Sequence, residues 1–163
     1  MQIGAWGDNE APEGTKDLVA LLDLAGLQPS VVDDAQGMLW SKALLNVAIN
    51  PICALAGVEN GAMLERTDLF EAGLGLLREA MRVGDALGVH LPSDEDIATR
   101  LVDVLLATSE NRCSMLEDFR CGRRSEIDAL NGAIVDYGAS VGCPTPLNAQ
   151  ITGMVRAVDA DHR

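Results

Sequence analysis

Aromatic and basic residues are both scarce in this chain of 163 residues. Aromatic side chains make up 3% of the sequence, so its apolar side chains are mostly leucine, valine, alanine and methionine. Such a core is typical of packed helices rather than of a β-sandwich, whose strands are rich in aromatic and β-branched residues. Lysine and arginine number 12 against 25 aspartates and glutamates, and the net charge is −13. This charge argues against nucleic acid as a partner, because phosphate contacts need clustered basic side chains.

Metal, disulfide and membrane signals are also lacking. The four cysteines form neither a C-x-x-C pair nor a zinc spacing, and no other cluster has the spacing of metal ligands. The N-terminus lacks the pattern of a secretory signal, so we expect reduced thiols. No stretch reaches the roughly 18 uninterrupted apolar residues that a membrane-spanning helix needs. The sequence therefore predicts a cytoplasmic protein that binds no metal and enters no membrane.

Apolar spacing and helix-breaking residues predict about seven helices and no convincing run of strands. Ser93 with Asp96 resembles a helix start, and Thr145 precedes a proline at a first helical position. We predict an all-α helical bundle over residues 15–163, preceded by a short, Gly-rich, non-helical segment over residues 1–14. The predicted helices span residues 15–27, 33–51 with a kinked continuation to 57, 67–88, 93–109, a short helix from 114, 125–141, and a last helix from 146.

A polar stripe interrupts one of the most apolar predicted helices. Lys42, Asn46 and Asn50 follow at four-residue steps, which place them on one helical face. A buried amide or ammonium without a partner costs about 1–3 kcal/mol, so the stripe predicts a polar partner, either another segment or a ligand. Lys42 is suited to act as a general acid, because an ammonium over a carbonyl can donate a proton as negative charge builds on the oxygen. The alternative is a lysine at a helix edge, its stem packed on Trp40 or Leu45.

A second polar patch lies between residues 111 and 132. Asn111 and Ser114 stand at a helix start, where backbone N–H groups suit a carboxylate ligand. Ordinary capping, with Ser114 and Asp118 closing a helix end, explains the same pattern. Glu126 falls in the first turn of a helix, where the helix dipole favours an acid whether or not a ligand binds. Asn131 carries the same ambiguity, and both interpretations stay open.

Together the two patches resemble the C-terminal domain of the ketopantoate reductase (2-dehydropantoate 2-reductase) family. In order and spacing, the fragments that carry the resemblance are Trp40-x-Lys42-x-x-x-Asn46-x-x-x-Asn50-Pro51, Asn60, Asn111-x-x-Ser114-Met115-x-x-Asp118, Gly122-Arg-x-Ser-Glu126-Ile-Asp-x-x-Asn131-Gly132 and Gly142-x-Pro-Thr-Pro146-x-Asn148.

The resemblance implies a fold, an activity and residue roles. The fold is that of the 6-phosphogluconate dehydrogenase C-terminal domain, and the activity is reduction of a small 2-oxo acid, ketopantoate to pantoate, with NADPH. Lys42 matches the family's proton donor, and Glu126 matches a carboxylate at the cofactor's nicotinamide end. Polar residues that hold the substrate match Asn46, Asn50, Asn60, Asn111 and Ser114.

The sequence departs from the family because it has no G-x-G-x-x-G motif and no β–α–β pattern. Residues 1–14 look like the final strand and exit loop of a Rossmann domain. We therefore expect half of an active site, which needs a Rossmann NADP-binding domain in cis or in trans and is inactive without it. The alternative is a stand-alone helical module that forms a homodimer or binds a small acid without catalysis.

Overall fold

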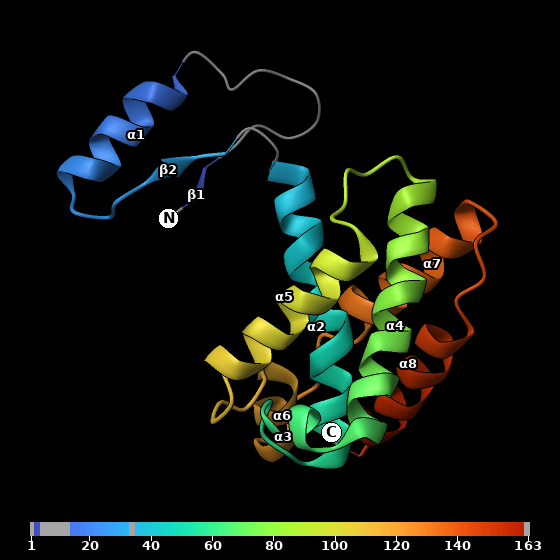
Figure 1. Ribbon diagram of the computed structural model, residues 1–163. Helices are drawn as coiled ribbons and strands as arrows, with labels where there is room; N and C mark the ends of the chain where they lie inside the picture. Colours follow the sequence, from blue (N-terminus) through green and yellow to red (C-terminus); the bar gives the residue numbers. More distant parts are fainter. Residues whose placement is uncertain (1, 4–13, 33–34, 162–163) are drawn as a thin grey trace. The chain divides into compact units, whose positions relative to one another are not determined.

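A computed structural model describes residues 2–3, 14–32 and 35–161 of the chain (Figure 1). The chain divides into two compact units, Met1–Trp40 and Ser41–Arg163. In the first unit, strands β1 (Gln2–Ile3) and β2 (Ser30–Val31) pair in parallel. Helix α1 (Thr15–Leu24) lies between them in sequence and contains no buried residue.

This β–α–β unit differs from the sequence prediction, which found no such pattern. Strands of two residues are too short to show the alternation by which strands are recognised. The predicted boundary between residues 14 and 15 falls inside the first unit, whereas the compact units divide after Trp40. Residues 4–13 of the predicted non-helical segment, and Asp33 at the predicted start of the next helix, lie outside the described residues.

The second unit is helical, which confirms the predicted all-α class. It contains the larger part of α2 (Ala35–Ala56) and the helices that follow it. These are α3 (Ala62–Glu65), α4 (Thr67–Ala86), α5 (Asp94–Ala107), α6 (Ser114–Arg120), the π-helix η1 (Asp128–Gly132), α7 (Ala133–Ser140) and α8 (Pro146–Asp159).

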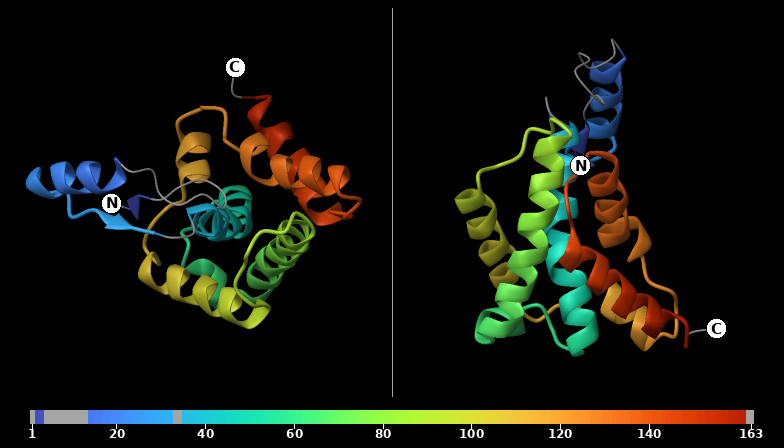
Figure 2. Two further views of the ribbon diagram at one scale, coloured as in Figure 1. Left: turned by 90° about the horizontal axis from the view of Figure 1, so that it is seen from above. Right: turned by 90° about the vertical axis from the view of Figure 1, so that its right-hand side faces the viewer.

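Helix α2 is the central element of this unit, with other helices on several sides of it (Figure 2). Leu44, Val47, Ala48 and Cys53 on α2 are at most 1% exposed, so they form the middle of the core. Helix α4 approaches α2 so closely that a Cβ at Gly73 would lie 3.0 Å from the backbone oxygen of Ala48. By length and composition α2 could cross a membrane, but its buried residues are those of a core helix.

Local sequence signals explain two of the helix starts. Ser93 Oγ accepts a hydrogen bond from the Asp96 amide at 3.2 Å, as the sequence predicted. Thr145 is the N-cap of α8, and Pro146 stands in its first turn, where a missing N–H is harmless. Two features differ from the prediction. Helix α3 forms between two predicted helices, and the predicted helix 125–141 is divided into η1 and α7.

Candidate active site

The polar stripe lies on one continuous helix, α2, as the spacing predicted. Its three side chains differ in exposure along the helix. Lys42 is exposed, Asn46 is half-buried and Asn50 is 5% exposed. The stripe therefore runs from the surface at Lys42 into the unit at Asn50.

Asn50 ends in a hydrogen-bonded cluster with Ser114 and Glu126. The Ser114 hydroxyl donates to Glu126 Oε1 at 2.6 Å. The Asn50 amide nitrogen lies 3.2 Å from the same carboxylate oxygen and 3.3 Å from Ser114 Oγ. Three residues that the sequence singled out in two separate patches thus meet at one point, which we call the Asn50 cluster. Ser114 uses its hydroxyl on Glu126, so capping of α6 does not explain this serine.

Two anchors hold the cluster in place. The Cys113 thiol, just before α6, donates to the Asn50 backbone oxygen at 3.4 Å. On the other side, Asp159 at the end of α8 accepts from the Ser125 amide at 3.0 Å and from its hydroxyl at 2.8 Å. Asp159 is 5% exposed, so this carboxylate fixes the residue before Glu126 from within the core. Sequence reasoning missed both anchors, because neither side chain shows a local pattern.

Asn60 and Asn111 lie at a different junction, between α3 and the loop before α6. The Asn60 amide nitrogen donates to Thr108 Oγ1, and its backbone N–H donates to the Asn111 carbonyl, both at 3.0 Å. Asn60 is buried and Asn111 is exposed. Within the described part of the chain, neither side chain hydrogen-bonds to the Asn50 cluster, so their predicted substrate contacts stay predictions.

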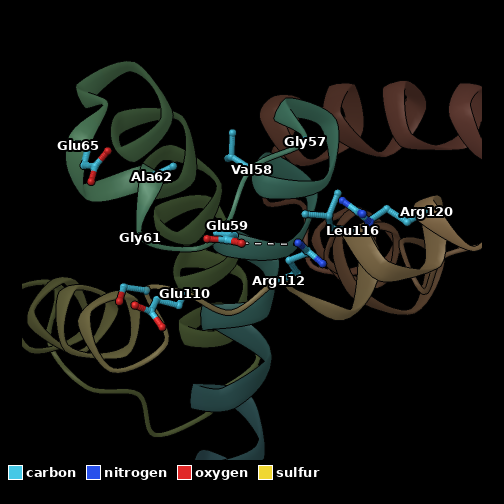
Figure 3. Close-up of a pocket in the computed structure, with 11 residues that line it drawn as sticks. Gly57, Val58, Glu59, Gly61, Ala62, Glu65, Glu110, Arg112, Leu116 and Arg120 are labelled. Carbon is cyan, nitrogen blue, oxygen red and sulfur yellow. Dashed lines mark ion pairs between the residues drawn. The ribbon is translucent and has the colours of Figure 1, made fainter.

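A cavity of about 500 Å³ opens beside this junction (Figure 3). Its charged lining includes Arg112, which pairs with Glu59 at 3.8 Å and with Glu117, outside the lining, at 3.4 Å. No predicted site residue lines it. The cavity is therefore separate from the Asn50 cluster and does not identify the substrate site.

The cysteines near the cluster are expected to be unreactive in the folded chain. Burial, and secondarily the neighbouring Cys113, raises the pKa of Cys53 from 9.0 to about 12, and burial raises the pKa of Cys113. At about pH 8 iodoacetamide should modify the exposed Cys121 and leave both buried thiols intact, as read by mass spectrometry of peptides. Cys121→Ser should remove the fast-reacting site. Rapid labelling of Cys113 in folded protein would contradict this packing.

The same pKa shift sets a pH dependence of stability. Because the folded pKa of Cys53 exceeds the unfolded one, its contribution is complete below about pH 9 and is lost as the pH rises toward 12. Between these pH values, the free energy of unfolding measured in urea should therefore fall more steeply with pH in the unchanged chain than in Cys53→Ala, which lacks this thiol.

Comparison with known proteins places these residues in a family. Residues 34–159 match the family described as "Ketopantoate reductase PanE/ApbA C terminal". The 2-dehydropantoate 2-reductase of Archaeoglobus fulgidus is 34% identical over 148 residues, which cover 90% of this chain and 49% of that protein. The Pyrococcus horikoshii 2-dehydropantoate 2-reductase is 33% identical over 154 residues, covering 94% and 50%.

Solved structures agree with this relationship. The PanE/ApbA family ketopantoate reductase from Ralstonia eutropha has a TM-score of 0.88 at 28% identity, covering 99% of this chain and 51% of that one. D-mandelate dehydrogenase in complex with NADH, at 21% identity, shares the fold with a TM-score of 0.89, covering 99% and 55%. The chain spans about half the length of the curated relatives it matches. From the family match, the identities and the helical fold, we conclude that this chain belongs to the ketopantoate reductase family and carries its C-terminal domain.

Proposed function

We propose that this chain supplies the substrate-binding and proton-donating half of an NADPH-dependent reductase of small 2-oxo acids, with ketopantoate as the leading substrate. The observation that carries the proposal is the meeting of Asn50, Ser114 and Glu126 at the buried end of the stripe that begins at Lys42. By the resemblance in the sequence, these positions match the substrate-binding and cofactor-end residues expected for the family.

The polar groups suit a 2-oxo acid chemically. Amides and a hydroxyl can donate to the substrate's carboxylate and accept from its hydroxyl, and an ammonium attracts the carboxylate. We assign Asn46 and Asn50 to the substrate along the face of α2, with Ser114 at the end of the stripe. Asn60 and Asn111 complete the proposed set from the neighbouring junction.

Reduction of a ketone adds a hydride to the carbonyl carbon and a proton to its oxygen. NADPH, held by the second domain, would supply the hydride and leave as NADP⁺. Lys42 Nζ donates the proton as negative charge builds on the oxygen, and the neutral amine then regains a proton from solvent. The Glu126 carboxylate fits the nicotinamide end of the cofactor, because it accepts hydrogen bonds from hydroxyl or carboxamide donors. Both of its bonds within the cluster end on Oε1, so we assign Oε2 to that role.

The site needs a second domain, for which we propose a Rossmann NADP-binding domain in cis or in trans. Lys42 is exposed in this chain, so shielding of its ammonium from water has to come from such a domain. The first unit supports this proposal. Its two parallel strands cannot form a stable sheet alone, and three of the four leucines of α1 are exposed. These three are Leu18, Leu21 and Leu24.

The proposal predicts that the chain alone neither binds NADPH tightly nor oxidises it with ketopantoate. Fusion to the nucleotide-binding domain of a two-domain relative should raise turnover by roughly 10²-fold or more, because the reactants are then held in one geometry. Consumption of NADPH, followed by its absorbance with ketopantoate and other branched 2-oxo acids, measures this. The added domain alone is the control. A folded fusion that binds NADPH but reduces none of these acids would contradict the proposal.

A further inference from the structure

A proline inside α2 leaves one buried backbone carbonyl without its helical donor. Helix α2 continues through Pro51, which has no backbone N–H. In an α-helix that N–H would bond to the carbonyl four residues earlier, which belongs to Val47. Val47 is 1% exposed, so water does not reach it freely. Buried backbone carbonyls are nearly always paired, and a donor from elsewhere is therefore required.

Asn131 provides that donor. The Asn131 amide nitrogen donates to the Val47 oxygen at 3.1 Å and to Asn148 Oδ1 at 2.9 Å. These two bonds use both hydrogens of its NH₂ group. Asn131 is fully buried, and its own Oδ1 has no partner within the described chain. An amide that stays buried although its oxygen is unsatisfied needs an explanation. For Asn131 we find that explanation in the two hydrogen bonds that its NH₂ group donates.

The backbone of η1 brings Asn131 to this position. The Gly132 N–H bonds to the Ile127 carbonyl at 2.9 Å, five residues earlier, which makes a π-turn of the kind that is rare and often found at functional sites. The turn is closed at the Ile127 carbonyl, and Ile127 directly follows Glu126. The bond to Val47 therefore ties the segment that carries Glu126 directly to the helix that carries the polar stripe.

We propose that Asn131 is a positioning residue, which sets the geometry of α2 at Pro51 and so holds Asn46 and Asn50 in register with Ser114 and Glu126. Asn46 immediately precedes Val47, and Asn50 immediately precedes Pro51, so each stripe amide adjoins one of the two residues between which the helical hydrogen bond is missing. That the positions of Asn46 and Asn50 affect catalysis rests on the proposed function. The structural coupling between Asn131 and Pro51, through the Val47 carbonyl, does not rest on it.

The coupling can be tested by restoring the missing N–H. Asn131→Leu leaves the Val47 carbonyl unpaired, and Pro51→Ala returns a backbone donor to it. In the full chain, Asn131→Leu should shift the side-chain NH₂ resonances of Asn50, and the double variant should return them to their position in Pro51→Ala. In the fused enzyme, Asn131→Leu should lower kcat by about 10- to 100-fold, and the double variant should recover most of that loss.

Asn148→Leu is the matched control, because it disturbs the same buried network without touching the Val47 carbonyl, so Pro51→Ala should not rescue it. Independent, additive effects of Asn131→Leu and Pro51→Ala on the Asn50 resonances would overturn the proposal. If Asn131→Leu fails to fold, the double variant must fold, and a double variant that stays unfolded also overturns it. An inactive fusion that keeps the coupling in the spectra would instead count against the proposed reductase function alone.

Discussion

Replacing Lys42 by alanine in the fused two-domain enzyme is expected to lower kcat by about 10²- to 10⁴-fold, with a smaller change in KM. The proton donor acts mainly in the transition state, where charge develops on the ketone oxygen, so its loss reduces turnover more than substrate binding. Steady-state kinetics with NADPH and ketopantoate measure the effect. Added methylammonium should restore part of the activity of Lys42→Ala, because it can occupy the vacated position and donate the proton.

The chain offers a matched control for this experiment, because Lys16 and Lys42 are its only lysines. Lys16 lies exposed on α1, in the first unit, and Lys16→Ala removes the same charge. We expect Lys16→Ala to keep the kcat of the fused enzyme. Near-normal turnover of Lys42→Ala, or an equal loss in both variants, would refute the assignment of Lys42 as proton donor.

The helices and the stripe could be predicted from sequence, because both depend on local periodicity. Four-residue steps place Lys42, Asn46 and Asn50 on one face of any helix that contains them. For Ser114 the sequence left capping and ligand binding open. Only the tertiary structure shows that its hydroxyl bonds to Glu126 rather than to the backbone of its own helix.

Long-range contacts explain what the sequence could not predict. Asn50 and Glu126 are 76 positions apart, and nothing local indicates that they meet. The buried carboxylates of Glu79 and Asp159 look like ordinary acids of amphipathic helices, since their partners are backbone amides of distant segments. The β–α–β unit was missed because strands of two residues leave no pattern.

Replacing Glu79 by alanine is expected to destabilise the chain by about 3–5 kcal/mol, because it leaves three donors, two of them buried, without their acceptor and opens a cavity. Glu79 lies on α4 and is 3% exposed. Its Oε1 accepts from the Leu147 amide at 3.0 Å, and its Oε2 accepts from the Asn148 amide at 3.0 Å and side chain at 2.9 Å. Pro146 has no N–H, so Glu79 binds the first two backbone donors of α8 and complements its dipole.

Urea unfolding followed by circular dichroism measures this loss. Total stabilities are about 5–15 kcal/mol, so Glu79→Ala stands near the limit of folding, and Glu79→Gln gives a milder test. Glutamine keeps one acceptor oxygen but brings an NH₂ group against backbone donors, so a loss of about 1–3 kcal/mol is expected. Glu71, two turns earlier on α4, is exposed, and Glu71→Ala should change stability by no more than about 0.5 kcal/mol.

Equal effects at positions 71 and 79 would contradict the capping role of Glu79. The same experiment bears on the Asn50 cluster, because Asn148 is held by Glu79 and in turn accepts from Asn131. A chain of buried hydrogen bonds thus runs from α4 through α8 and η1 to the Val47 carbonyl on α2. Loss of Glu79 should therefore disturb the side-chain NH₂ resonances of Asn50 even in Glu79→Gln, whereas Glu71→Ala should leave them in place.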